Sequence, residues 1–375
     1  MVLKNATIYN SDFEPQKADI LLDGEKIAKI GEALCGEDEL DLSGCIIFPG
    51  FVDIHIHGCD GADMSDASGE SLEKMSRFLA NHGVTSFCPA TMTLPEEQLV
   101  SQFEAAAAFL GKETGAYIHG VNMEGPYISL AKKGAQPGEY IRLPDIEEFK
   151  NLNSICKISL VDLAPEVEGA FEFANEASKT CTVSQAHTDA DFVTAEAGYK
   201  NGFSHATHLF SAMPPIEHRA PGAVTAAFDS STVTAELICD GIHAHPPILR
   251  MAFRLLGEDR SVAVSDAMSA SGCGDGEYEL GGQKVFVKNG RASLVDGNLA
   301  GSTTNLFKEF LNLISFDIPF KQALKSCTIN PAKVIGADSL TGSLKEGKLA
   351  DILVVDEFLR IKMVIVKGKI VVSQL

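Results

Sequence analysis

The chain has 375 residues, of which 45% are hydrophobic and 22% are charged, as is ordinary for a globular protein. This length exceeds what one small core needs, and it suits one large α/β barrel with a minor domain. The formal net charge of −20 argues against nucleic acid or an anionic membrane as a partner, and it means that an anionic substrate needs a local basic pocket.

Both ends of the chain read as short strands with polar turns. Residues 1–48 contain the runs LKNATIYN and ADILLDGEKIAKI, and the second run includes the hairpin-turn pair Asp23-Gly24. Residues 340–375 contain ADILVVDEF and IKMVIVKGKIVV, with a Lys-Gly turn inside the second run. We expect residues 1–48 and 340–375 to form one small β-sandwich domain.

Strand-like runs alternate with helix-patterned segments over residues 49–339. The runs are FVDIH at 51, VTSFCP at 84, YIHGVNM at 117, KISLVDLAP at 157, CTVSQAH at 181, SHATH at 204, TAELICD at 234 and SVAVSD at 261. Eight such runs, separated by segments such as SLEKMSRFLANHG and EGAFEFANEASK, predict an α/β fold with a (β/α)8 barrel of the TIM type. A hairpin-like insert, EYELGGQKVFVKNGRASLV, follows the eighth run, and helices near 302–314 and 319–336 complete the unit.

Six side chains able to bind a metal or transfer a proton lie where these runs end. They are His55, His57, Glu124, His187, His208 and Asp266. The strands of a closed parallel barrel end at one rim, so residues far apart in sequence meet there. Imidazole and carboxylate are the ligands of hydrolytic zinc centres, and the sequence therefore predicts a metallohydrolase.

The spacing of these residues indicates how a metal could be held. His55-x-His57 places two imidazoles on one side of an extended segment, although a pair of core or surface histidines has the same pattern. If Glu124 is buried, its carboxylate would destabilise the fold without a cation beside it. The alternative is that Glu124 is an exposed loop residue. With His187 and His208, each of which could alone be a hydrogen-bonded core histidine, it forms a set that leaves a position open for water.

Other polar residues suggest proton transfer and substrate binding. Asp266 can take a proton from a nucleophilic water and return it to a leaving group, or it can cap the following segment. Arg219 lies in a Pro-rich loop, where a guanidinium can grip phosphate, although most loop arginines are merely solvated. His243 follows the seventh run and can polarise a carbonyl. We expect His119 to pack inside its strand and His82 to end a helix.

Ten short motifs carry a resemblance to a known family. They are PGFVDIHIHG (49–58), MEGPYIS (123–129), KKGAQ (132–136), LAPE (163–166), AHTDA (186–190), ATHLFSAMP (206–214), HRAPG (218–222), CDGIHAHP (239–246), SDAMSASG (265–272) and LAGST (299–303). On these motifs the chain resembles, over nearly its whole length, the N-acetylglucosamine-6-phosphate deacetylases of the amidohydrolase superfamily. The resemblance implies a (β/α)8 barrel with a small β domain from both termini, and usually a dimer.

The resemblance also implies a metal centre. Glu124, His187 and His208 are expected to hold the main metal, and Glu124 takes the role that a carbamylated lysine has in related hydrolases. His55 and His57 stand where some members have Gln and Asn, and they can complete a second metal site. We therefore expect one or two divalent ions per subunit, Zn²⁺ first, with Fe²⁺, Mn²⁺ or Co²⁺ as ions that the same ligands accept.

The substrate site follows from the same resemblance. Asp266 is expected to be the catalytic acid/base, His243 to contact the acetyl carbonyl, and Arg219 to reach the phosphate bound by the neighbouring subunit of a homodimer. Further substrate contacts are expected from Ala135, Gln136, Ser211, Ala212, Asp240, Leu299, Ala300 and Gly301.

Three residues depart from the family's pattern. Ser211 stands where Asn is usual, Gln136 where many members have a histidine, and Ala220 where Glu is common. We expect none of them to touch the metal, so the reaction type is retained while the preferred sugar epimer stays open.

The expected reaction is hydrolysis of N-acetyl-D-glucosamine 6-phosphate to D-glucosamine 6-phosphate and acetate, in amino-sugar catabolism. The first alternative is the same reaction on N-acetylgalactosamine 6-phosphate. More distant alternatives are hydrolysis of a cyclic amide or an N-acyl amino acid, and a barrel without metal that only binds a partner.

Cysteine usage and hydropathy favour a cytoplasmic protein. The nine cysteines are scattered between Cys35 and Cys327 without a CxxC pair, which suits reduced thiols better than a disulfide framework. No apolar run reaches the ~18–20 residues of a membrane span, and the N-terminal segment lacks the apolar core of a signal peptide. We expect a small-molecule substrate, with neither nucleic acid nor membrane as a partner.

Overall fold

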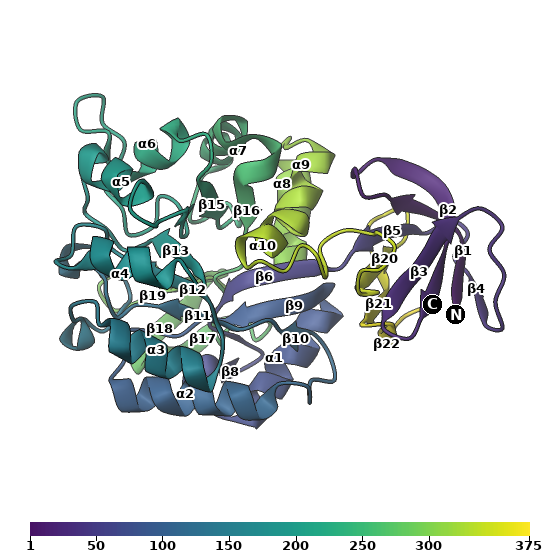
Figure 1. Cartoon of the computed structure of the whole chain (residues 1–375), viewed down its shortest axis with the longest axis horizontal. Helices are drawn as coiled ribbons and strands as arrows, with labels where there is room; N and C mark the ends of the chain where they lie inside the picture. Colours follow the sequence, from purple (N-terminus) through teal and green to yellow (C-terminus); the bar gives the residue numbers. More distant parts are fainter.

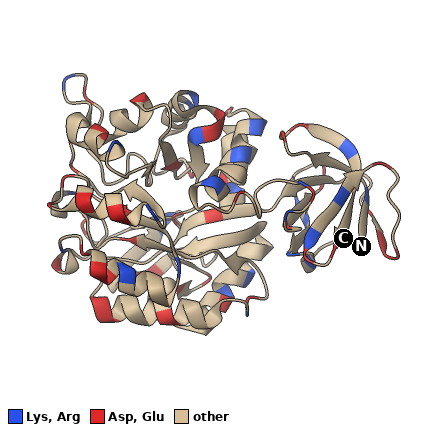
Figure 2. Ribbon diagram, viewed as in Figure 1, with Lys and Arg blue, Asp and Glu red and all other residues tan.

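The computed structural model describes residues 1–375, which form a large α/β part and a smaller β-sheet part at its side (Figure 1). None of the helices combines the length and the apolar character that crossing a membrane requires. Acidic and basic residues are interspersed over both parts (Figure 2).

Both ends of the chain contribute to one mixed sheet, drawn in purple and yellow in Figure 1. The N-terminal end supplies β1 (Val2–Tyr9), β2 (Pro15–Asp23), β3 (Lys26–Gly31), β4 (Glu39–Asp41) and β5 (Ile46–Pro49), and the C-terminal end supplies β20 (Ile352–Val355), β21 (Ile361–Val366) and β22 (Lys369–Ser373). The strand order is β22-β21-β20-β5-β1-β2-β3, with β4 beside β1. A separate apolar core of 15 buried residues accompanies this sheet.

Tight turns join the hairpins of this sheet. Gly24 has a φ of 56° between β2 and β3, and Lys367 and Gly368 have φ values of 46° and 76° between β21 and β22. Positive φ in a two-residue turn matches the twist of the strands it joins. A Cβ atom on Gly368 would collide with the carbonyl oxygen of Gly24, so hairpins from opposite ends of the chain touch at their turns.

Parallel strands form the centre of the α/β part. They are β6 (Phe51–Ile56), β9 (Val84–Pro89), β10 (Tyr117–Ile118), β11 (Val121–Glu124), β12 (Ile158–Leu163), β13 (Thr182–Gln185), β14 (His205–Ala206), β15 (Thr234–Leu237) and β16 (Ser261–Ala263). They lie in two sheets, with the orders β10-β9-β6 and β11-β12-β13-β14-β15-β16. Isolated parallel bridges connect Ala90 to Asn122 and Ile56 to Ala267, on either side of the first sheet.

Helices follow most of these strands and surround them in Figure 1. They are α1 (Gly69–Asn81), α2 (Glu96–Phe109), α3 (Ile146–Ile155), α4 (Ala170–Ala177), α5 (Phe192–Tyr199), α6 (Gly222–Asp229), α7 (Pro246–Arg260), α8 (Leu306–Ser315), α9 (Phe320–Ser326) and α10 (Ile329–Val334). Shorter elements are β7 (Gly58–Cys59), β8 (Ala62–Asp63), η1 (Met64–Asp66), η2 (Leu130–Lys132) and η3 (Gly138–Tyr140). The main core contains 72 buried residues, among them apolar side chains of the parallel strands and their helices.

Each of the eight predicted runs contains a strand, but the third run contains two. β10 and β11 are separated at Gly120, which has a φ of 135°. A Cβ there would clash with the side chain of Ser159 and lie 2.8 Å from the carbonyl oxygen of Lys157, so the chain approaches β12 too closely for a side chain. His119, beside the break, is half-buried, and its ring lies 5.3 Å from that of Tyr117.

Two other predictions need correction in detail. The predicted helix at 319–336 is two helices, α9 and α10, because Pro331 cannot donate a hydrogen bond and its ring would clash with the carbonyl of Cys327 in a continuous helix. The predicted hairpin insert is a three-stranded antiparallel sheet of β17 (Gly276–Leu280), β18 (Gln283–Lys288) and β19 (Arg291–Ser293). His82 ends α1 as predicted, with its Nδ1 2.7 Å from the carbonyl oxygen of Phe78.

Candidate metal centre

Six polar side chains from the ends of β6, β11, β13, β14 and β16 converge at one place. Their exposed fractions are His55 0%, His57 3%, Glu124 2%, His187 5%, His208 3% and Asp266 7%. Three of them follow their strand on a left-handed backbone, with φ values of 45° at His187, 27° at His208 and 44° at Asp266. Residues other than glycine rarely adopt this backbone conformation. Such backbone strain concentrates at functional sites.

Glu124, His187 and His208 form the first group of candidate ligands. The Oε1 atom of Glu124 lies 3.0 Å from Nε2 of His187 and 3.1 Å from Nε2 of His208. The two Nε2 atoms lie 3.2 Å from each other. Two imidazole nitrogens this close cannot both face each other with bare lone pairs, so a proton or a cation between them is required. The exposed-loop alternative for Glu124 is wrong.

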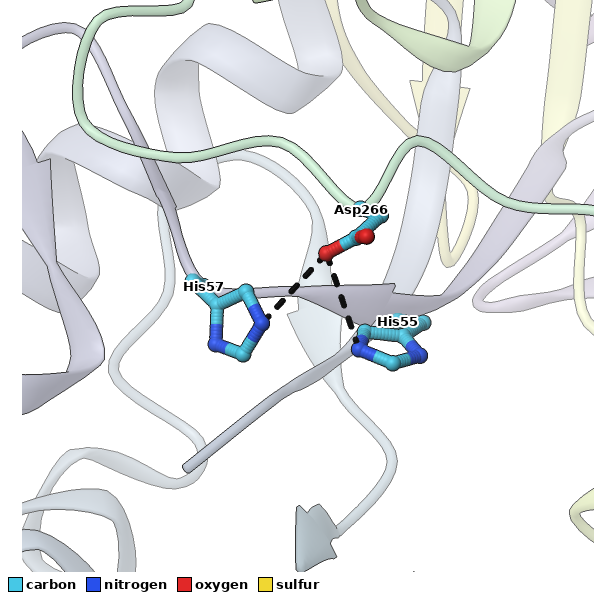
Figure 3. A group of neighbouring side chains, drawn as sticks. All are labelled: His55, His57 and Asp266. Atoms are coloured by element: carbon cyan, nitrogen blue, oxygen red, sulfur yellow. Dashed lines mark ion pairs between the residues drawn. The ribbon is translucent and has the colours of Figure 1, made fainter. Parts of the chain in front are cut away.

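His55, His57 and Asp266 form the second group (Figure 3). The Oδ1 atom of Asp266 lies 3.4 Å from Nε2 of His57 and 3.7 Å from Nε2 of His55. Glu124 joins the two groups, because its Oε2 is 3.3 Å from Nε2 of His57. Nε2 of His55 is buried without a hydrogen-bond partner, which is what a ligand atom shows when its metal is absent. The donors present therefore fit one or two divalent ions.

Contacts behind three of the imidazoles turn their Nε2 atoms toward the centre. Nδ1 of His187 lies 2.9 Å from the carbonyl oxygen of Lys132, and Nδ1 of His57 lies 3.3 Å from that of Ala90. Nδ1 of His55 lies 3.0 Å from Oε2 of Glu236. An acceptor at Nδ1 holds a proton there, so Nε2 is the nitrogen that a metal can bind in place of a proton.

The electrostatics of the group favour a positive charge at its centre. Burial opposes ionisation of Glu124, but hydrogen bonds from His187, His208 and His57 hold the pKa of its carboxyl well below its usual range. Burial lowers the pKa of His57, but hydrogen bonds to Asp266 and Glu124 outweigh burial and raise the pKa of His57 to about 10. Ionised carboxylates therefore face the space between the imidazoles, and they can hold a cation there.

A cavity of about 570 Å³ opens above the centre, which is a usual size for a small-molecule site. Among the substrate contacts predicted from the sequence, those that line it are Ala135, Gln136, Ser211, Ala212, His243, Leu299 and Gly301. The lining also includes His57, Glu124, His187, His208 and Asp266. Lys132 and Lys133 supply the basic groups that an anionic substrate needs in a chain of net charge −20.

Three of the predicted substrate residues do not line this cavity. Asp240 lies behind His243, with its Oδ2 2.7 Å from the Nδ1 of that residue, so it orients the imidazole instead. Ala300 is 0% exposed. Arg219 is exposed and lines a separate cavity of about 460 Å³ with Asp189 and other residues.

Gln136, one of the three residues that depart from the family's pattern, hydrogen-bonds to the candidate ligand Glu124. Its Nε2 donates a hydrogen bond of 2.6 Å to Oε2 of Glu124, and its Oε1 accepts one of 2.6 Å from the backbone of Thr93. The side chain is 2% exposed. The sequence analysis did not predict this contact, because it depends on how the loop after η2 folds back over β11, which spacing along the chain does not reveal.

The sequence analysis missed a layer of buried polar residues below the centre. Glu236 in β15 is 0% exposed and contacts His55, His208 and His205. Asp162 in β12 is also 0% exposed, and burial raises the pKa of its carboxyl to about 8. A signal was present, because both acids interrupt apolar strand runs, and a buried carboxylate needs a partner.

Comparison with known proteins agrees with this geometry. The sequence model of the amidohydrolase family matches residues 46–371 of this chain. The chain is 38% identical over 338 residues to N-acetylglucosamine-6-phosphate deacetylase of Bacillus subtilis, covering 87% of this chain and 84% of that protein. It is 31% identical over 334 residues to N-acetylgalactosamine-6-phosphate deacetylase of Escherichia coli, covering 87% of each. The crystal structure of N-acetylglucosamine-6-phosphate deacetylase from Pasteurella multocida matches with a TM-score of 0.93 at 29% identity, covering 98% of both chains.

Histidines and acids at the ends of parallel strands, beneath one cavity, define the class as a hydrolase with a candidate metal centre. The chain belongs to the amidohydrolase family.

Proposed function

We propose that this protein is a metal-dependent deacetylase that converts N-acetyl-D-glucosamine 6-phosphate and water to D-glucosamine 6-phosphate and acetate, in amino-sugar catabolism. The observation that carries the proposal is the meeting of Glu124, His187 and His208 with Asp266 at the floor of one cavity. The named activity of the Bacillus subtilis relative supports the choice of substrate.

The proposed architecture is a closed (β/α)8 barrel over residues 49–339, with a small β-sandwich domain from residues 1–48 and 340–375. Closure is supported by the parallel bridges from Ala90 to Asn122 and from Ile56 to Ala267, which lie where β9 would meet β11 and β6 would meet β16. Strand ends of a closed barrel face one rim, where active sites of this fold lie.

The proposed cofactor is one or two divalent ions per subunit, Zn²⁺ in the first place. Glu124, His187 and His208 would hold the main ion, and His55 and His57 would hold a second. A bound ion would act as a Lewis acid toward the nucleophilic water and the amide carbonyl. Fe²⁺, Mn²⁺ and Co²⁺ suit the same donors, so supply decides among them.

Asp266 would transfer the proton in this reaction. Burial opposes its ionisation, but the hydrogen bond with His57 and the charges of the nearby imidazoles lower the pKa of its carboxyl. It is therefore a carboxylate near pH 7, able to take a proton from water as the water oxygen bonds to the acetyl carbon. As the carbon–nitrogen bond breaks, Asp266 gives this proton to the departing amine, which is a poor leaving group without it.

His243 would bind the acetyl carbonyl. It lines the cavity, and Asp240 holds its Nδ1 at 2.7 Å, which directs the opposite nitrogen away from Asp240. A polar group held in place before the reaction stabilises the developing negative charge on the carbonyl oxygen without reorganisation. Ala135, Gln136, Ser211, Ala212, Leu299, Ala300 and Gly301 are the further residues proposed to form the sugar phosphate site.

The proposed assembly is a homodimer in which Arg219 reaches the phosphate in the neighbouring subunit. Its exposure outside the cavity of its own chain supports this role, because a loop arginine there is free to enter a second copy. A bidentate guanidinium suits a phosphate monoester. The nine free cysteines support a reducing cytoplasmic location.

The test is hydrolysis of two N-acetyl sugars, a cyclic amide and an N-acyl amino acid at equal enzyme concentration, measured as acetate release for the sugars, ring opening for the cyclic amide and amine release for the N-acyl amino acid. The proposal predicts turnover of N-acetylglucosamine 6-phosphate and a kcat/KM at least about 100-fold lower for unphosphorylated N-acetylglucosamine, because the phosphate contacts are lost. A cyclic amide and an N-acyl amino acid should give no turnover. Equal kcat/KM with and without the phosphate would contradict the proposal.

The galactosamine epimer is the second candidate substrate. Ser211 lines the cavity with a shorter side chain than the family's usual Asn, and the Escherichia coli relative is named for this epimer. Comparing kcat/KM on the two 6-phosphates decides between them. We expect the gluco compound to be preferred.

A further inference from the structure

A fully buried carboxylate lies behind His55. Glu236, in β15, is 0% exposed. Its Oε2 atom lies 3.0 Å from Nδ1 of His55 and accepts a hydrogen bond of 3.1 Å from the backbone N–H of His208. Its Oε1 atom lies 3.4 Å from Nε2 of His205. One side chain therefore contacts a member of each group of candidate ligands.

This contact decides how His55 can act. The carboxylate is an acceptor only, so Nδ1 of His55 must carry the hydrogen that lies between them. The lone pair of Nε2 then faces the other candidate ligands, with Glu124 and Asp266 each 3.7 Å away. Nε2 has no hydrogen-bond partner, which leaves this lone pair available.

The other candidate ligands with a partner at Nδ1 are held differently. His57 and His187 each face a backbone carbonyl, of Ala90 and Lys132 respectively. Among the candidate metal ligands, His55 alone faces a carboxylate at Nδ1. A carboxylate behind a ligating imidazole raises its basicity, and losing such a partner typically weakens metal binding by about 10–100-fold.

We propose that Glu236 is a positioning residue, whose carboxylate fixes the tautomer of His55, raises the basicity of its imidazole and thereby enables the site of His55 and His57 to bind its metal. The inference rests on the proposed metal centre and adds the condition under which the second ion binds. The main ion, held by Glu124, His187 and His208, depends on Glu236 only through the backbone of His208.

The decisive variant is Glu236→Gln, which keeps the shape of the side chain. The Gln oxygen can take the place of Oε2, where it accepts from the N–H of His208 and from Nδ1 of His55, and the amide nitrogen then faces His205. The variant therefore removes the negative charge behind His55 and keeps the acceptor, so the basicity of the imidazole at Nε2 falls. Co²⁺ titration of metal-free protein, followed by visible absorption and by metal content after dialysis, reports each site without reference to activity.

The expected result is two equivalents of Co²⁺ in the wild type, and in Glu236→Gln a second equivalent bound at least about 10-fold more weakly, with the first unchanged. The matched control is His205→Gln, in the same buried layer, which leaves the contact of Glu236 with His55 and should bind like the wild type. In a His55→Asn background, adding Glu236→Gln should change nothing further.

A second measurement needs no variant at Glu236. Long-range ¹H–¹⁵N spectra of metal-free wild type labelled at histidine nitrogen should show His55 protonated at Nδ1, with the signal assigned by its loss in His55→Asn. Protonation at Nε2 alone would overturn the inference even if Glu236→Gln did not fold.

The outcomes distinguish failure of the role of Glu236 from failure of the proposed function. Equal affinity for the second Co²⁺ in wild type and Glu236→Gln, or a wild type with one site only, overturns the role of Glu236 and leaves the deacetylase proposal standing. A wild type that binds no Co²⁺ overturns the metal centre itself.

Discussion

Asp266 is buried and lines the cavity, and its carboxyl has a lowered pKa that keeps it ionised. The change Asp266→Asn keeps the shape but cannot accept a proton, so we predict a fall in kcat of about 100- to 10,000-fold. Binding of substrate should change little, since the side chain acts on the reacting atoms. Steady-state kinetics and calorimetric titration measure the two effects separately.

A matched control for that change is Asp145→Asn. Asp145 caps α3 by accepting hydrogen bonds from the backbone of Glu147 and Glu148, and Asn caps helices about as well. It should retain the wild-type kcat. A similar loss in both variants, or wild-type turnover in Asp266→Asn, would contradict the assigned role.

His119 gives a pH dependence of stability that is separate from catalysis. Burial, with the nearby charges of Lys157 and Lys367, lowers its pKa from 6.5 to about 4. Between these values the unfolded chain binds a proton that the folded chain does not, so the free energy of unfolding falls as the pH drops through this window. The loss from this group is about 2–3 kcal/mol.

The variant His119→Gln removes the titrating group, so it should lose about 2–3 kcal/mol less stability than the wild type between pH 6.5 and pH 4. Urea unfolding of both proteins at the two pH values, with chelator present throughout, measures this difference. Parallel losses in the two proteins would show that His119 is not held neutral.

At the scale of elements, the strands were predictable because their apolar runs are bounded by turn residues and end in polar side chains. The break between β10 and β11 was not, since it arises from the close approach of Gly120 to β12. The contact of Gln136 with Glu124 was not predictable either, because it joins a loop to a strand and the spacing of the two residues along the chain does not indicate that they meet. Helix 319–336 was mispredicted although Pro331 was a visible signal.

The break at Gly120 has a measurable consequence. In Gly120→Ala, the Cβ would meet Ser159 and Lys157 on an unfavourable backbone, so the variant should be destabilised by about 2–4 kcal/mol. Because β11 carries Glu124, affinity for the main metal should fall as well. Urea unfolding of metal-free protein and Co²⁺ titration measure the two losses.

Gly111→Ala is the control for backbone strain alone. Gly111 also has a positive φ, of 79°, but a Cβ there would have no atom within 4 Å. It should cost about 1–2 kcal/mol, with metal affinity unchanged. Equal destabilisation of the two variants would show that the approach to β12 is not what requires glycine.

At the scale of the whole molecule, the proposed dimer makes each active site depend on two chains. Arg219→Ala and Asp266→Asn should each lower turnover, the first by weakening phosphate binding and the second by removing proton transfer. In a mixed dimer, the Arg219→Ala chain keeps its own Asp266 and receives Arg219 from its partner. One intact site is thereby restored.

Mixing the two variants under conditions of subunit exchange should therefore raise acetate release above either variant alone, up to about a quarter of the wild-type rate for random pairing. The rate should be compared with that of the variants kept apart, and the mass in solution should be that of a dimer. Activity that never exceeds the mean of the separate variants would place Arg219 in its own subunit's site or outside any site.

The residues of the candidate site were more predictable from the sequence than the buried side chains that support them. Its residues lie at the ends of runs that parallel strand pairing brings together, so chain order and residue type sufficed for His55, Glu124 and Asp266. The supporting contacts, such as that of Glu236 with His55, depend on strand register and side-chain direction. Sequence shows a buried acid there but not the atom that it faces.

The most direct test of the central claim is to remove the metal and follow acetate release from N-acetylglucosamine 6-phosphate. If Glu124, His187 and His208 hold the ion on which hydrolysis depends, turnover should fall in proportion to metal content and return when Zn²⁺ is added. Circular dichroism should show that the fold persists throughout. Undiminished turnover at less than about a tenth of an equivalent of metal would contradict the account.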